Sequence, residues 1–120
     1  MQPMIAVCHT VSSLADGATP LLPKFASVAV SSANANAIVT AVTSKKVRVV
    51  AAFLMANGTV NAKWQSGSTD QTGLAYLLAN VGYVLPFNPV GWFETASGEA
   101  LNLHLSGAIA VGGCITYVEV

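Results

Sequence analysis

Residues 47–66, with the sequence VRVVAAFLMANGTVNAKWQS, hold the clearest secondary-structure signal in the chain. Residues 47–55 form its longest apolar run, and the valines in it favour a central strand over a short buried helix. Asn57-Gly58 follows this run, and these two residue types best tolerate the positive φ angles of a type I′ turn. The stretch therefore predicts an antiparallel hairpin with strands near 47–56 and 59–66.

Alternation within the predicted strands assigns their faces. Val60, Ala62 and Trp64 point to one side of the second strand and polar residues to the other, so we expect Trp64 to lie in the core. Residues 101–105, Leu-Asn-Leu-His-Leu, alternate in the same way, which places three leucines inside. His104 then belongs to the solvent or interface face.

The remaining chain continues as short β-type segments separated by turn residues. Such spacing, without a long amphipathic helix, is typical of an all-β antiparallel β-sandwich. We favour a jelly-roll-like arrangement, and an immunoglobulin-like sandwich remains the alternative. Further strands are expected at 25–30, 37–42, 81–85, 92–95 and 114–120, with residues 74–78 as a strand or a helical turn and Gly112-Gly113 as a turn or bulge.

The first 22 residues differ from the rest of the chain. They contain prolines and Asp16-Gly17 without a clear period, which indicates an extended arm with a turn and at most one short strand, at 5–9. We therefore divide the chain into an N-terminal arm, residues 1–22, and a β-sandwich domain, residues 23–120.

Charge is unusually scarce in this sequence. Charged residues make up 8% of the chain, whereas about 25% is usual for soluble domains. Interface cores are depleted in charge, so this composition favours a surface that neighbouring subunits cover, in a homo-oligomer or a larger assembly. A monomer with a surface rich in Ser, Thr and Asn is the alternative.

The charge balance also bears on partners. Five basic and five acidic residues cancel, and the one basic cluster, Lys45, Lys46 and Arg48, lies between apolar stretches as a charged turn would. We therefore expect no nucleic-acid partner. We expect no membrane partner either, because no apolar run approaches a membrane span. The N-terminus lacks a basic signal-peptide region, which indicates an intracellular origin and reduced thiols at Cys8 and Cys114.

Residues suited to chemistry are few. Cys8, His9, His104 and Cys114 are the soft metal ligands, and their spacing does not match the ligand pairs of zinc sites. The sequence contains no G-x-S-x-G elbow and no phosphate-binding glycine loop. We therefore expect no enzyme activity, no catalytic residues, no metal site and no cofactor.

Apolar side chains in the arm and in one loop are the best contact candidates. The loop at 86–93 combines prolines with aromatic residues and fits either an internal plug or an interface anchor. Sugar stacking on Trp92 is a third use. The predicted protein-interface residues are Met4, Ile5, Val7 and Leu14 in the arm and Phe87, Pro89, Trp92 and Phe93 in the loop.

Four segments of the second half carry a family resemblance. They are Asn-Gly-Thr-Val at 57–60, Trp-Gln-Ser-Gly-Ser-Thr-Asp at 64–70, Pro-Phe-Asn-Pro at 86–89 and Trp-Phe-Glu-Thr-Ala-Ser-Gly-Glu-Ala-Leu-Asn-Leu at 92–103. With them, residues 36–120 resemble small jelly-roll proteins encoded in tailed bacteriophages and prophages, among them head decoration (cement) proteins.

The resemblance implies a structural virion protein that is assembled in the bacterial host cytoplasm. Its implied partners are the major capsid protein or other virion subunits, and it implies a homo-oligomer, with a trimer favoured over a dimer. A tail or fibre component that recognises the host, with the polar loop at 66–73 as its tip, remains open. So does a carbohydrate-binding module.

Overall fold

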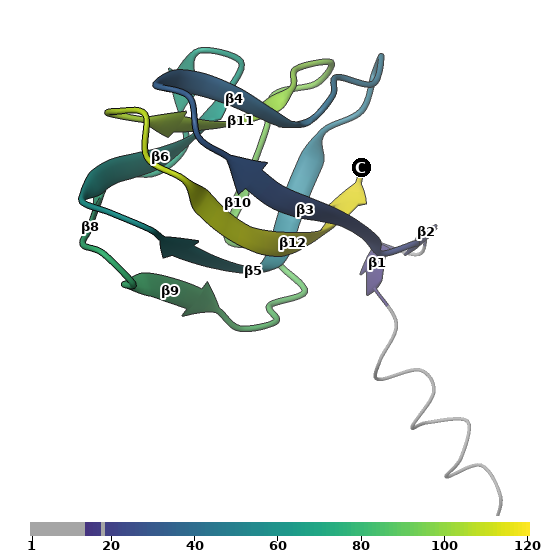
Figure 1. Ribbon diagram of the computed structural model, residues 1–120. Coiled ribbons are helices and arrows are strands. Elements are labelled where there is room, and N and C mark those ends of the chain that lie inside the picture. Colours follow the sequence, from purple (N-terminus) through teal and green to yellow (C-terminus); the bar gives the residue numbers. More distant parts are fainter. Residues whose placement is uncertain (1–13, 18) are drawn as a thin grey trace, which may run out of the picture.

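The computed structural model describes residues 14–17 and 19–120 and is drawn in Figure 1. This part of the chain folds into strands alone, without a helix. The strands are β1 (Leu14–Asp16), β2 (Thr19–Leu21), β3 (Lys24–Val30), β4 (Asn34–Val39), β5 (Val47–Ala56), β6 (Val60–Ser66), β7 (Thr69–Asp70), β8 (Ala75–Leu77), β9 (Gly82–Leu85), β10 (Phe93–Glu94), β11 (Leu101–Leu105) and β12 (Val111–Glu119).

Two five-stranded antiparallel sheets face each other (Figure 1). The first sheet has the order β3-β12-β5, and both β9 and β10 pair with the free edge of β5. The second sheet has the order β4-β11-β6, and both β7 and β8 pair with the free edge of β6. The predicted all-β antiparallel sandwich is confirmed.

The strand order is that of a jelly roll. The strands β3 to β12 can be numbered as eight positions, with β3 as position 1 and β12 as position 8, when β7 and β8 share one position and β9 and β10 share another. The first sheet then has the order 1-8-3-6 and the second sheet the order 2-7-4-5. First and last strands pair, then second and second-last, so the chain behaves like one long hairpin rolled into two sheets. The predicted jelly-roll-like arrangement is therefore confirmed.

Side chains from both sheets fill the space between them. Trp64, Leu101, Leu103 and Leu105 are each at most 1% exposed, as the alternation in their strands predicts. Val60 and Ala62 lie in the same core. Burying aliphatic and aromatic side chains on this scale is the main stabilising contribution to such a domain.

The hairpin predicted from Asn57-Gly58 is wrong. β5 and β6 belong to different sheets, and Asn57-Gly58 carries the chain from one to the other. Neither residue has the positive φ that a type I′ turn needs, and the backbone N–H of Asn57 donates instead to the carbonyl of Ala110 over 2.8 Å. Both edges of β5 are already taken by β12 and by β9 with β10, so long-range pairing overrides the local turn signal.

Gly112-Gly113 is also not a turn, because both residues lie inside β12. Gly113 has a φ of +153°, and a Cβ there would come within 1.9 Å of the carbonyl oxygen of Phe53. Only glycine allows β12 to approach β5 this closely. The glycine thus serves strand pairing in the middle of the first sheet.

β4 begins earlier than the predicted strand at 37–42 and covers Asn34–Val39. Asparagine disfavours strands, but Asn36 stands on an edge strand. Its side-chain amide donates to the carbonyl oxygens of Ser32, Asn34 and Leu103 over 2.8–3.2 Å. These bonds offset the poor strand propensity of the residue.

The described end of the arm forms a short hairpin. Asp16-Gly17 makes its turn, with a φ of +62° at Gly17, as the sequence predicts. Leu14 is 5% exposed and packs against Val50 and Val118, on the outer side of the first sheet. The strand predicted at 5–9 lies outside the described residues.

Candidate interaction surface

The central part of the outer side of the first sheet forms one continuous surface without charged side chains, which we call the apolar face. Strand pairing sets its residues in three rows that run across β3, β12, β5 and β9. Alternation turns these residues away from the core. They are Phe25, Ser27, Ala29, Ala51, Phe53, Met55, Val84, Gly112, Cys114 and Thr116.

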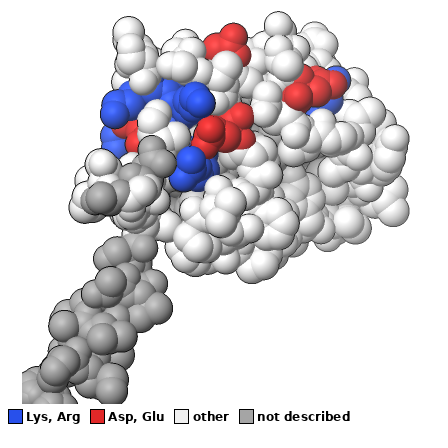
Figure 2. Space-filling view, turned by 180° about the vertical axis from the view of Figure 1, so that it is seen from behind, with Lys and Arg blue, Asp and Glu red and all other residues white. Residues whose placement is uncertain are grey.

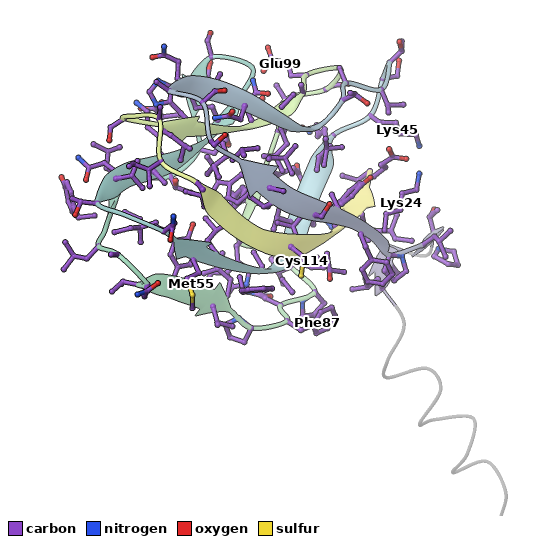
Figure 3. All side chains as sticks on the ribbon, viewed as in Figure 1. Lys24, Lys45, Met55, Phe87, Glu99 and Cys114 are labelled. Carbon is purple, nitrogen blue, oxygen red and sulfur yellow. The ribbon has the colours of Figure 1, made fainter. Side chains whose placement is uncertain are left out.

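Large apolar side chains stand exposed on this face. Phe25 is 77% exposed, Val84 70%, Met55 51% and Phe53 44%, and Phe87 adds a further exposed ring beside them. Figure 3 shows Met55, Cys114 and Phe87 on the same side of the first sheet. Single exposed apolar residues are ordinary, but a contiguous group of this kind is typical of an interaction site.

The apolar face has two unequal halves. The half on β5 and β9 carries the bulky Phe53, Met55 and Val84. The half on β3 and β12 carries small residues such as Ala29 and Gly112, apart from Phe25 near the start of β3. Two hollows lie beside the bulky residues. One of about 510 Å³ lies between Met55, Gly112 and Ala29, and one of about 290 Å³ lies between Phe53, Phe87 and Cys114.

The outer side of the second sheet, which we call the polar face, has a different character. Lys63 and Asp70 form an ion pair there, with 3.0 Å between Nζ and Oδ2, and the side-chain amide of Gln65 donates to Oδ1 of Asp70 over 2.8 Å. The hydrogen bonds from Gln65 and then Lys63 lower the pKa of Asp70. Strand pairing sets His104 beside Lys63.

Most other charges form pairs near one end of the sandwich. Arg48 Nε lies 2.7 Å from Oε1 of Glu94, and Lys46 lies 3.8 Å from its other oxygen. Lys24 and Glu119 pair over 2.7 Å. Figure 2 shows the charged side chains in a few small groups on the upper part of the molecule, above a broad uncharged surface.

An aromatic cluster closes the open edge of the sandwich. The rings of Trp64 and Phe93 stack with centroids 5.5 Å apart, and Trp64 Nε1 donates to the hydroxyl of Tyr83 over 3.0 Å. Burial raises the pKa of Tyr83. Trp92 donates from Nε1 to the carbonyl of Pro86 over 2.8 Å, and both tryptophans line a hollow of about 350 Å³.

The predicted contact residues fall in different environments. Phe87 and Pro89 are exposed, Trp92 is 44% exposed and Phe93 is half-buried. Leu14 is buried against the first sheet of its own chain. The remaining arm candidates, Met4, Ile5 and Val7, lie outside the described residues.

Sequence reasoning missed the apolar face itself. The signal was the apolar run at 47–55, unbroken from Val49 onward, which places apolar residues on both sides of β5. Its inner side fills the core, and its outer side presents Phe53 and Met55. A strand that is apolar on both sides in a two-layer sandwich leaves one side without an intramolecular partner.

Residues suited to metal binding or redox chemistry do not gather in the described part of the chain. Cys114 is a free, exposed thiol. His104 keeps a buried Nδ1 without a hydrogen-bond partner. No group of three or more His, Cys, Asp or Glu residues that could hold a metal ion occurs within residues 14–17 and 19–120.

Comparison of the chain with family models, with curated proteins and with solved structures finds no match. Among the described residues, no helix is long and apolar enough to span a membrane.

Proposed function

We propose that this chain is a structural virion protein of a tailed bacteriophage, acting as a capsid decoration (cement) protein that stabilises the head by binding capsid subunits. The observation that carries the proposal is the apolar face, where Phe25, Phe53, Met55 and Val84 stand exposed without a charged neighbour among the outward residues of the face. Surfaces of this kind are stable in water when another protein covers them.

The organisation of the polar groups supports a structural role. The charged side chains named above form ion pairs or accept hydrogen bonds, as Asp70 does from Gln65 and Lys63. They do not converge on a pocket in the way that catalytic groups do. A decoration protein needs contact area rather than an active site, and many copies on one lattice strengthen one another's binding if each copy is multivalent.

The loop at 86–93 is the best candidate for contact with a capsid subunit. Its backbone is bonded to β5 at Val49 and Val50. Phe87 and Val90 are exposed, and the hydrogen bond from Trp92 to the carbonyl of Pro86 holds the Trp92 ring in place. Rigid aromatic anchors contribute strongly to interfaces because little side-chain entropy is lost on binding. The arm candidates Met4, Ile5 and Val7 would add to this contact.

The copy number of the protein in purified phage particles tests the proposal. Quantitative mass spectrometry should find it at a level comparable to the major capsid protein. A few copies per particle would instead assign it to the tail or fibre and to host recognition. Absence from the particle would overturn the virion role.

A carbohydrate-binding module is the second candidate, and the hollow lined by Trp92 favours it. Trp92 is half-exposed and held by its ring N–H, as sugar-stacking rings often are. The purified protein should then bind glycans, and Trp92→Ala should abolish this binding. A protein that binds no glycan would overturn this second candidate.

A further inference from the structure

We propose that the apolar face binds the same face of a second copy of this chain, forming a dimer with its two-fold axis parallel to the strands. This proposal rests on the proposed structural role in one respect: the capsid contact must leave the apolar face free for another protein. The partner it names is the chain itself, and the capsid contact stays with the rest of the loop at 86–93, around Val90 and Trp92, while Phe87 borders the apolar face.

The shape of the face is complementary to itself. A two-fold axis along the strands places β5 over β12 of the other copy and β9 over its β3. In the central row, Ser27, Cys114, Phe53 and Val84 are neighbours across the sheet. The axis therefore sets Phe53 over the small Cys114, and Val84 over the small Ser27.

The two neighbouring rows follow the same rule. Ala29, Gly112 and Met55 are neighbours in one row, so Met55 comes to lie over Gly112, in the hollow of about 510 Å³ that both residues line. In the other row, Phe25 stands at the β3 edge and comes to lie beside Phe87 of the second copy. Bulky residues thus meet small ones or hollows, which is the packing of an isologous interface.

The absence of charge on the face suits a contact between identical surfaces. A two-fold axis brings each surface against its own image, so a charged residue near the axis would meet a like charge. None of the ten outward residues of the face is charged. The ion pair between Arg48 and Glu94 lies at the end of β5, beyond these rows, where rim charges are tolerated.

The size of the face can be compared with that of known interfaces. The three rows span five residues of β3, β12 and β5, so four strand positions about 4.8 Å apart, at about 3.3 Å per residue, give a flat projection of roughly 320 Å². Protruding rings such as Phe25 and Phe87 increase the accessible area well beyond the projection. The roughly 800 Å² per partner of a standard stable interface is larger than the flat projection, so the exposed rings must supply the rest of the contact.

Sedimentation equilibrium of the full chain over a range of concentrations tests the proposal. The wild-type chain should have the mass of a dimer. Phe53→Lys places a charge in the centre of the contact and should raise the dissociation constant by roughly 100-fold or more. The matched control is Tyr76→Lys, at a 75% exposed position on the polar face, and it should leave the dimer unchanged.

A second variant guards against loss of folding in Phe53→Lys. A Cβ at Gly112 would meet only the carbonyl oxygen of Val28, at 3.8 Å, so Gly112→Leu should fold while its side chain blocks the position of Met55 from the second copy. It should be a monomer. A dimer that survives both Phe53→Lys and Gly112→Leu would overturn the proposal.

Other results also decide against it. A monomer at every concentration would overturn the dimer, and if deletion of residues 1–13 then produced dimers, the face would belong to the N-terminal segment of its own chain. The mass of a trimer would overturn the two-fold arrangement. None of these results bears on the presence of the protein in phage particles, so the proposed function is tested independently.

Discussion

The two outer faces of the sandwich differ although a single core supports both. The apolar face presents rings and aliphatic side chains such as Phe53 and Val84. The polar face carries Lys63, Gln65 and Asp70 in one hydrogen-bonded group. Folding requires only the inner side of a sheet to be apolar. An apolar outer side therefore indicates that this side binds another protein.

The difference arises in the strands themselves. In β6 and β11 apolar residues face the core at every second position, and Asn61, Lys63, Asn102 and His104 stand between them, although Gln65 and Ser66 at the end of β6 are both buried. β5 does not alternate, because Phe53 and Met55 occupy its outward positions. The polar face is therefore built for water, and the apolar face for another protein.

The largest effect should come from breaking the first sheet alone. In Gly113→Val the new Cβ would lie 1.9 Å from the carbonyl oxygen of Phe53, so β12 and β5 must separate. We expect a loss of several kcal/mol in the free energy of unfolding or failure to fold, because backbone clash inside a sheet is a severe defect. Urea denaturation measures this.

Gly112→Ala is the matched control for that variant. Gly112 is the preceding residue of the same strand, its side faces outward and the nearest atom to a new Cβ is 3.8 Å away. Its midpoint of unfolding should stay close to that of the wild type. Equal damage from both variants would contradict the close approach of β12 to β5 at Gly113.

The shared core should be next in sensitivity. Trp64 is 1% exposed and contacts Phe93 between the sheets, so Trp64→Ala should lower the free energy of unfolding by about 3–5 kcal/mol. Trp92→Ala removes a half-exposed ring and should cost clearly less. Chemical denaturation of the two variants compares them, and a larger loss from Trp92→Ala would contradict the assignment of Trp64 to the core.

Surface variants should separate the two faces without unfolding the domain. A solvatochromic hydrophobic dye should fluoresce with the dilute wild-type chain, and the double variant Phe53→Ser with Met55→Ser should lower that signal roughly twofold or more, since contiguous exposed apolar area binds such dyes. Tyr76→Ser on the polar face is the control and should leave it unchanged. A signal that falls only in Tyr76→Ser would reverse the assignment of the faces.

The smallest effect should be a pH effect on the polar face. The bonds from Gln65 and Lys63 lower the pKa of Asp70 below its ordinary value of 3.8. A depressed folded pKa means that this stabilisation is present above the unfolded pKa and is lost as the pH falls through the folded pKa. Because the carboxylate is exposed, the change in stability should be slight.

An NMR titration of the Asp70 carboxyl carbon should therefore give a midpoint below 3.8. Gln65→Ala should raise this midpoint, because it removes the hydrogen bond that contributes most to the shift. An unshifted midpoint in the wild type would mean that the group is not formed in solution.

Alternation allowed much of the fold to be predicted from the sequence. It identified Val60, Trp64 and the leucines of 101–105 as core and indicated a sandwich, because burial on one side of a sheet imposes a period of two. The prediction failed at Asn57-Gly58. A local turn preference is weak beside the ladder between β5 and β12, whose partners lie about sixty residues apart in the chain.

The surface was less predictable than the core. Scarce charge indicated that some surface is covered by protein, but composition does not say where. The exposed loop residues Phe87 and Trp92 were identified because prolines marked the loop. Phe53 and Met55 were missed as surface residues because an apolar run predicts burial, and only the packing of the core shows that Ala52 and Leu54 face inward.

The reactivity of Cys114 tests the central claim most directly, because this exposed thiol lies in the middle row of the apolar face. In a Cys8→Ser variant, which leaves Cys114 as the single cysteine, the rate of labelling by a small thiol reagent would be measured at low and high protein concentration. We expect labelling to slow as the concentration rises and to recover when Phe53→Lys is added. A labelling rate that is independent of concentration and unchanged by Phe53→Lys would contradict the claim that the apolar face binds a second copy of the chain.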